Sequence, residues 1–147
     1  MKKKIAILGS TGSIGKTFIN IIKKDKKNFD IILLTTNKNI KQLMIQVSEF
    51  NVKNIIVSDH KKYLLLKKIL KNKKINIYND FFSLKKIFKN NKVDYTMSAI
   101  SGLEGLHPTL EIISFTKKIG IANKESIICG WHLIKNELLK NKTIFIP

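Results

Sequence analysis

The chain contains no arginine, since every one of its 28 basic residues is a lysine. It also has a single cysteine and two prolines. Its apolar runs are far shorter than the about 20 residues that a membrane-spanning helix needs. One cysteine cannot form an intramolecular disulfide, which fits a reducing compartment. The sequence therefore predicts a cytoplasmic protein that has no disulfide framework and no membrane partner.

The lysines outnumber the 10 acidic residues and give a formal net charge of +18. A nucleic-acid-binding protein usually retains arginine, whose planar guanidinium binds phosphates and guanine bidentately. Aromatic residues are not interleaved with the lysines as stacking platforms would be. The lysines come as scattered pairs: Lys23-Lys24, Lys61-Lys62, Lys67-Lys68, Lys85-Lys86 and Lys117-Lys118. We interpret them as solvated surface and expect no specific nucleic-acid partner; a polyanion site, with steep salt dependence, is the alternative.

The cysteine and the histidines do not suggest a reactive site. Cys129 lies in the apolar stretch 127–131, where we expect a small buried side chain and not a nucleophile. His60, His107 and His132 lie far apart and lack metal-ligand spacing. We expect all three histidines on the surface or in satisfied structural positions.

Strand-like and helix-like segments alternate along the chain. The expected strands are residues 4–8, 30–35, 55–57, 75–78, 95–98, 119–122 and 143–146. The expected helices, with apolar residues at helical spacing, are residues 13–24, 40–50, 63–70, 81–88, a helix opened by Pro108, and 125–139. Such alternation pairs strands in parallel through right-handed crossovers. The prediction is one α/β domain over residues 1–147, built on a doubly wound, mostly parallel sheet.

A glycine-rich segment, GSTGSIG at residues 9–15, joins the first strand to the first helix. Glycines at these spacings allow a tight turn, close approach to a pyrophosphate and close packing of the helix. The free N–H groups and dipole at the start of the helix favour phosphates. The strand–loop–helix context therefore predicts a Rossmann-like dinucleotide-binding domain, with a purely structural turn as the alternative.

The end of the second strand indicates which dinucleotide binds. An NAD site usually has an acidic residue there, about 20 residues beyond the glycines, for the ribose hydroxyls. This chain instead has Asn37, Lys38 and Asn39. Lys38 would attract a 2′-phosphate, and the two amides could donate to it. The sequence favours NADPH, unless Lys38 is simply one more surface lysine.

Four segments together resemble one family, 1-deoxy-D-xylulose 5-phosphate reductoisomerase. They are GSTGSIG at 9–15, NKN at 37–39, MSAISGL at 97–103 with the following GL and PT pairs, and ANKES at 122–126. The likeness runs over the whole chain. The ANKES segment is the most specific of the four, because no general property of Rossmann folds requires it.

The resemblance implies an NADPH-dependent enzyme of non-mevalonate isoprenoid biosynthesis. It would convert 1-deoxy-D-xylulose 5-phosphate to 2-C-methyl-D-erythritol 4-phosphate with Mn²⁺ or Mg²⁺, as a homodimer whose contacts lie largely outside this region. The residues implied for the pyrophosphate are Thr11, Gly12, Ser13 and Ile14. Those implied for the 2′-phosphate are Asn37, Lys38 and Asn39. Those implied for the nicotinamide ribose are Asn123 and Glu125, and Lys124 is implied for the substrate.

Two departures from the family matter. The family commonly has glycine where this chain has Asn37, so we expect the loop to persist with altered cofactor affinity. The family's acidic metal-binding element follows the closing strand and proline, whereas this sequence ends at Pro147. Hard divalent cations need converging oxygen ligands, and the sequence shows no such acidic cluster. No catalytic or metal-ligating residue is therefore assigned in this chain, and a free-standing NADPH-binding or sensing module is the alternative function.

Two other oxidoreductase classes share single features with this sequence. Tyr63 and Lys67 match the Tyr-x-x-x-Lys of short-chain dehydrogenases, but they fall in the third helix and not beyond the fourth strand. Aspartate-semialdehyde dehydrogenases share a similar glycine-rich loop, but Cys129 lacks the setting of their nucleophile. We interpret the match at Tyr63 and Lys67 as a coincidence, and Cys129 has no suitable histidine partner in the sequence.

We expect the 147-residue chain alone to be inactive, because the metal ligands that would hold the substrate are missing from its sequence. The measurement is NADPH oxidation by the isolated chain in the presence of 1-deoxy-D-xylulose 5-phosphate and Mn²⁺. Measurable turnover would contradict this expectation.

Overall fold

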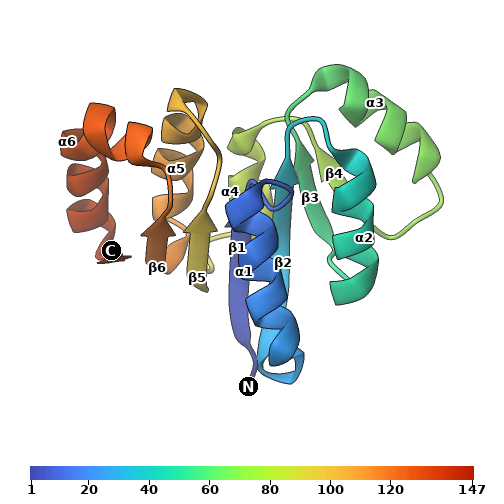
Figure 1. Cartoon of the computed structure of the whole chain (residues 1–147), viewed down its shortest axis with the longest axis horizontal. Helices are drawn as coiled ribbons and strands as arrows, with labels where there is room; N and C mark the ends of the chain where they lie inside the picture. The colour runs from blue at the N-terminus through green and yellow to red at the C-terminus, as the bar shows by residue number, and fades with distance from the viewer.

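The computed structural model describes residues 1–147, which form a single seven-stranded sheet in the order β4-β3-β2-β1-β5-β6-β7 (Figure 1). The strands are β1 (Lys3–Leu8), β2 (Phe29–Thr36), β3 (Asn54–Val57), β4 (Asn76–Tyr78), β5 (Val93–Ser98), β6 (Thr116–Ile121) and β7 (Ile144–Ile146). Every neighbouring pair is parallel. The predicted doubly wound α/β fold is confirmed.

The helices cover both faces of the sheet. They are α1 (Ser13–Lys24), α2 (Ile40–Phe50), α3 (His60–Ile69), α4 (Leu84–Phe88), α5 (Leu106–Ile113) and α6 (Lys124–Asn141), with 3₁₀ turns η1 (Lys26–Asn28), η2 (Phe81–Ser83) and η3 (Leu103–Gly105). Helices α1, α2 and α3 contribute to one hydrophobic core, and α4, α5 and α6 contribute to the other. None of these helices combines the length and the apolar character needed to span a bilayer.

The central strand β1 shows why the strands are continuous apolar runs. Ile5 and Ile7 belong to the core under α1 and α2, whereas Ala6 and Leu8 belong to the core under α5 and α6. Successive side chains of a strand point to opposite faces, so a strand covered on both sides is apolar at every position.

The direction in which strands are added reverses beside β1. The chain proceeds from β1 through β2 and β3 to β4, then returns to the other side of β1 with β5 (Figure 1). At such a reversal the loops leaving the two central strands diverge to opposite faces of the sheet. Ligands of open α/β sheets bind in the resulting crevice, at the carboxyl ends of the strands.

Several predicted helices begin differently from the expectation, and the one expected at residues 63–70 begins at His60. The helix expected at residues 81–88 opens as the 3₁₀ turn η2, where Asp80 Oδ1 accepts from the Ser83 N–H at 3.2 Å. Pro108 was expected to open its helix, but α5 begins at Leu106. Proline is still in the first turn, where its missing N–H leaves no intrahelical hydrogen bond unmade.

The prediction that Cys129 is buried is wrong, because its side chain is exposed. The buried face of α6 is a row of residues four apart, Ser126, Gly130, Ile134 and Leu138. Cys129 precedes Gly130 by one residue and therefore points about 100° away from that row. The three histidines are exposed, as expected.

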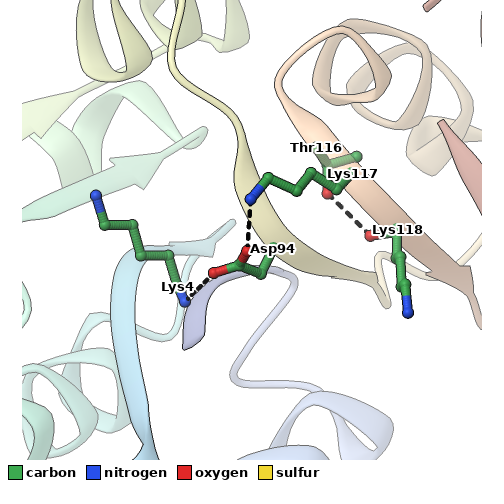
Figure 2. Close-up of polar contacts among 5 residues, drawn as sticks. All are labelled: Lys4, Asp94, Thr116, Lys117 and Lys118. Carbon is green, nitrogen blue, oxygen red and sulfur yellow. Dashed lines mark hydrogen bonds and ion pairs between the residues drawn. The ribbon is translucent and has the colours of Figure 1, made fainter. Parts of the chain in front are cut away.

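Asp94 of β5 links three neighbouring strands near their amino-terminal ends (Figure 2). Its carboxylate accepts from the Lys117 ammonium of β6 at 2.8 Å and from the Lys4 N–H of β1, also at 2.8 Å. The Lys117 hydrogen bond, followed by that of Lys4, holds the pKa of the Asp94 carboxyl below its ordinary value. The charged carboxylate is therefore favoured in the folded state.

Asp94→Asn is expected to reduce stability at neutral pH by at most about 1 kcal/mol, because the pair is partly exposed. A lowered folded-state pKa stabilises the fold above the ordinary aspartate pKa of about 4, and this contribution disappears as the pH falls through the lowered value. Urea unfolding of both proteins over a series of pH values from neutral downward measures the difference. A difference that stays constant in acid would contradict this account.

Candidate dinucleotide-binding site

A cleft of about 440 Å³ opens where β1, β2 and β5 end, at the reversal of strand order. Its lining residues are Gly9, Thr11, Gly12, Thr35, Thr36, Asn37, Ser58, Phe81, Ala99, Ile100, Ser101, Glu104, His107 and Pro108. A second hollow of about 280 Å³ is lined by Ser13, Ile14, Ala99, Ser101, Gly102, Ala122, Asn123, Lys124 and Glu125. The two hollows share Ala99 and Ser101, so they lie next to each other at the ends of the central strands.

The glycine-rich loop fits against its neighbours only because residues 9 and 15 have no side chain. Gly9 has φ +76°, and a Cβ there would lie 2.7 Å from the Ala99 carbonyl oxygen. A Cβ on Gly15 would lie 2.2 Å from the Gly9 carbonyl oxygen. Gly12 is less constrained, since the nearest atom to its Cβ would be 3.6 Å away. Gly9 and Gly15 therefore bring the start of α1 against the end of β1.

Backbone donors are concentrated at this junction. The N–H groups of Thr11, Ser13, Ile14 and Gly15 have no hydrogen-bond partner. The Gly12 N–H is directed to the Gly9 carbonyl oxygen at 3.3 Å. The first turn of α1 contains no acidic residue, so no carboxylate of that turn offsets the positive end of the helix dipole. This junction can bind an anionic group such as a diphosphate.

The segment after β2 carries a free positive charge. Asn37, Lys38 and Asn39 are exposed, and the Lys38 ammonium makes no ion pair or hydrogen bond. Asn39 caps α2 by accepting from the Gln42 N–H at 3.1 Å. The Asn37 side chain accepts from the Ser58 hydroxyl at 3.2 Å. The segment is thus fixed at both asparagines, while Lys38 extends into solvent beside the cleft.

Asn37 does not need the backbone freedom of the glycine that the family resemblance led us to expect at this position. Its φ is not among the positive values of this chain. An asparagine therefore fits this loop without backbone strain, and the expected change in cofactor affinity stays a prediction.

The side chain of Asn123 is committed to the protein backbone. It is 2% exposed, and its Oδ1 caps α6 by accepting from the Ser126 N–H at 3.0 Å. Its Nδ2 donates to the carbonyl oxygens of Ile100 at 2.5 Å and Gly102 at 2.6 Å. Asn123 thereby ties the loop after β5 to the start of α6. Lys124, which is exposed, and Glu125, which is half-buried, follow it and line the smaller hollow.

Several cleft residues were not anticipated from the sequence. Phe81 comes from η2, and Glu104 and His107 come from η3 and the start of α5. His107 was expected on the surface, where it does lie, but nothing in its local sequence indicated a cleft. Only the return of the chain beside β1 brings these residues to Gly9.

Tyr63 and Lys67 lie apart from this cleft, on α3. The Lys67 ammonium donates to the Tyr63 hydroxyl at 3.2 Å and lies over its ring. Neighbours four residues apart on a helix meet in this way without any catalytic requirement. No group of three or more histidine, cysteine or acidic side chains is placed so that it could hold a metal ion.

Comparisons with known proteins agree on one family. The model of the 1-deoxy-D-xylulose 5-phosphate reductoisomerase family matches residues 5–130. A relative of that name from Pelagibacter ubique (strain HTCC1062) is 63% identical over 146 residues, covering 99% of this chain and 38% of the relative. One from Porphyromonas gingivalis is 33% identical over 147 residues, again with 38% of the relative covered. The chain thus spans well under half the length of these relatives.

Solved structures show the same likeness. The reductoisomerase from Zymomonas mobilis in complex with NADPH superimposes with a TM-score of 0.88 at 29% identity, covering 100% of this chain and 38% of that one. A reductoisomerase in complex with NADPH, fosmidomycin and magnesium gives a TM-score of 0.88, covering 99% of this chain and 36% of that one. Homoserine dehydrogenase from S. aureus, with a TM-score of 0.56 and 20% identity, shares the fold alone.

Gly15→Ala is expected to destabilise the fold, because the added methyl group would overlap the Gly9 carbonyl. We expect a loss of about 1–3 kcal/mol, the usual effect of overpacking. Gly12→Ala is the matched control, since its Cβ has room. Urea unfolding of both variants measures the effect. Equal stability of the two would show that the close contact at Gly15 is not a constraint.

Proposed function

Because this chain belongs to the 1-deoxy-D-xylulose 5-phosphate reductoisomerase family, we propose that it supplies NADPH binding to such an enzyme. The complete enzyme would convert 1-deoxy-D-xylulose 5-phosphate, a phosphorylated sugar, to 2-C-methyl-D-erythritol 4-phosphate. When bound, NADPH supplies the hydride for the reduction. We further propose a cytoplasmic location and a homodimeric complete enzyme.

The glycine-rich junction between β1 and α1 is the observation that carries this proposal. The unpaired N–H groups of Thr11, Ser13 and Ile14 lie at this junction, together with the positive end of the α1 dipole. In our proposal these groups, with the backbone at Gly12, hold the cofactor diphosphate. A diphosphate suits the site because its oxygens accept hydrogen bonds from N–H groups that otherwise have no partner.

The segment Asn37–Asn39 supports NADPH over NADH. A carboxylate at the end of β2 would repel the 2′-phosphate, and none is present at residues 35–39. In our proposal the uncommitted Lys38 ammonium pairs with the 2′-phosphate. Asn39 contributes by fixing the start of α2, and the Asn37 amide can donate because only its oxygen is engaged with Ser58.

The smaller hollow supports a site for the nicotinamide half. In our proposal Glu125 accepts from the ribose hydroxyls and Asn123 acts mainly by holding the surrounding loops. Lys124 would reach the substrate, where an ammonium can stabilise a hydroxyl or a developing oxyanion. The exposure of Lys124 and the partial burial of Glu125 are compatible with these roles.

The divalent metal of the family does not fit the residues of this chain. Mn²⁺ and Mg²⁺ require several converging oxygen ligands, and no acidic cluster is present among residues 1–147. We therefore propose that these residues supply cofactor binding, and that metal binding and catalysis depend on residues of the complete enzyme outside this chain.

Lys38→Gln is expected to weaken NADPH binding roughly tenfold, the scale of one charge-assisted hydrogen bond, and to leave NADH binding unchanged. Fluorescence titration with each cofactor at constant salt measures this selectivity. Lys24→Gln is the matched control, because this exposed lysine lies at the opposite end of α1 from the cleft. Equal effects of the two substitutions would show that Lys38 acts only through the general positive charge of the surface.

A further inference from the structure

A buried polar bridge connects the glycine-rich loop to α2. Ser10 is 0% exposed and Gln46 is 1% exposed. The Ser10 hydroxyl donates to Gln46 Oε1 at 2.7 Å, and Gln46 Nε2 donates to the Ser10 carbonyl oxygen at 2.9 Å. The oxygen and the nitrogen of the Gln46 amide therefore both bind the same loop residue, Ser10.

Gln46 is unusual for its position on the helix. It lies on the buried face of α2 with Leu43 and Val47, where a polar side chain is unfavourable unless it is hydrogen-bonded. The bridge requires a donor and an acceptor at the same time, which a neutral amide provides. An ionised carboxylate would place an acceptor against the Ser10 carbonyl oxygen. An apolar side chain would leave that carbonyl oxygen unpaired, while the Ser10 hydroxyl would keep only the Thr35 carbonyl oxygen, at 3.3 Å, as its acceptor.

The remaining polar groups of this part of the loop also face inward. The Ser10 N–H donates to the Thr35 carbonyl oxygen at 3.0 Å, and the Gly9 N–H donates to Thr35 Oγ1 at 2.9 Å. Ser10 therefore has its N–H, its hydroxyl and its carbonyl oxygen all bound within the protein. Its peptide groups have little freedom to rotate.

The orientation of the Ser10 carbonyl determines where the next N–H points. In a trans peptide the C=O and the following N–H point in opposite directions. Because Gln46 holds the Ser10 carbonyl oxygen toward the interior, the Thr11 N–H points away from it. That N–H has no partner, and Thr11 lines the cleft.

We propose that Gln46 is a positioning residue for the cofactor: it holds the Ser10–Thr11 peptide so that the Thr11 N–H is presented to the dinucleotide diphosphate. The inference rests on the proposed NADPH binding at the glycine-rich loop. Gln46 itself does not line the cleft and acts only through Ser10.

The first test replaces the amide without removing its volume. Gln46→Met keeps an unbranched side chain of similar length but neither hydrogen bond. We expect NADPH affinity to fall about tenfold, because the Thr11 N–H would no longer be held toward the diphosphate. A tenfold loss corresponds to about one net hydrogen bond. Gln42→Met is the matched control, because Gln42 is on the same helix and its side chain makes no hydrogen bond. Unfolding curves show what fraction of each variant is folded.

The second test restores the bridge chemically. A protonated glutamic acid offers one donor and one acceptor, as glutamine does, and burial raises the pKa of a carboxyl group. The Gln46→Glu variant should therefore bind NADP⁺, which tolerates acid, nearly as well as the wild type at about pH 5.5 and about tenfold more weakly at about pH 9. The affinity of the variant is divided by that of the wild type at each pH, so that the effect of cofactor phosphate titration on binding cancels.

Three results would overturn the inference. In the first, Gln46→Met and Gln42→Met affect NADPH affinity equally. In the second, the loss in Gln46→Met is fully explained by its unfolded fraction. In the third, the ratio of Gln46→Glu to wild-type affinity does not change with pH. If the folded wild-type chain fails to bind NADPH, the proposed function and this inference both fail. The three results above instead contradict the role of Gln46 alone, since in each of them the wild type binds NADPH.

Discussion

At the carboxyl end of β1, the backbone of α1 comes so close to the preceding loop that a Cβ on Gly15 would lie 2.2 Å from the Gly9 carbonyl oxygen. The rest of the site depends on this close approach. It places the first turn of α1 against the residues that directly follow the central strand. Because β5 returns on the other side of β1, the same point also borders the crevice where loops from both halves of the sheet separate.

The end of β2 connects the segment proposed for the diphosphate with the segment proposed for the 2′-phosphate. Thr35 accepts from the backbone of Gly9 and Ser10, and the Thr36 and Thr11 hydroxyls lie 2.6 Å apart. Asn37–Asn39 follow immediately along the same chain. The groups proposed for the diphosphate and for the 2′-phosphate therefore belong to one hydrogen-bonded unit, which α2 closes through Gln46. In the proposed function, the two phosphate-binding segments are therefore held in fixed positions relative to each other.

Much of this fold could be predicted from periodicity alone. The helices at residues 13–24 and 40–50 have the predicted bounds, because apolar spacing and turn residues mark both ends of each. The glycine-rich loop could be placed because a tight strand–helix turn depends on residues that are close in sequence. The prediction for Cys129 failed because a shift of one residue along α6 moves a side chain from the core to the solvent. The apolar residues around Cys129 do not indicate which of them face the core.

The contacts that complete the site could not be predicted in this way. Gln46 meets Ser10 across 36 residues, and Asn123 meets the Ile100 carbonyl across 23. Each of these pairs forms only when the sheet brings separate loops together. Sequence reasoning identified Asn123 through family resemblance, but it did not indicate that the side chain binds backbone and caps α6.

The central claim is that the 147-residue chain binds NADPH through the junction of β1 with α1. A ¹⁵N NMR titration of the chain with NADPH, at near-physiological salt, tests it most directly. The account predicts saturable shifts that are largest at the amides of Thr11, Ser13, Ile14 and Gly15, with Lys38 responding to NADPH and not to NADH. Absence of binding, or small shifts spread over the lysine-rich surfaces, would contradict it.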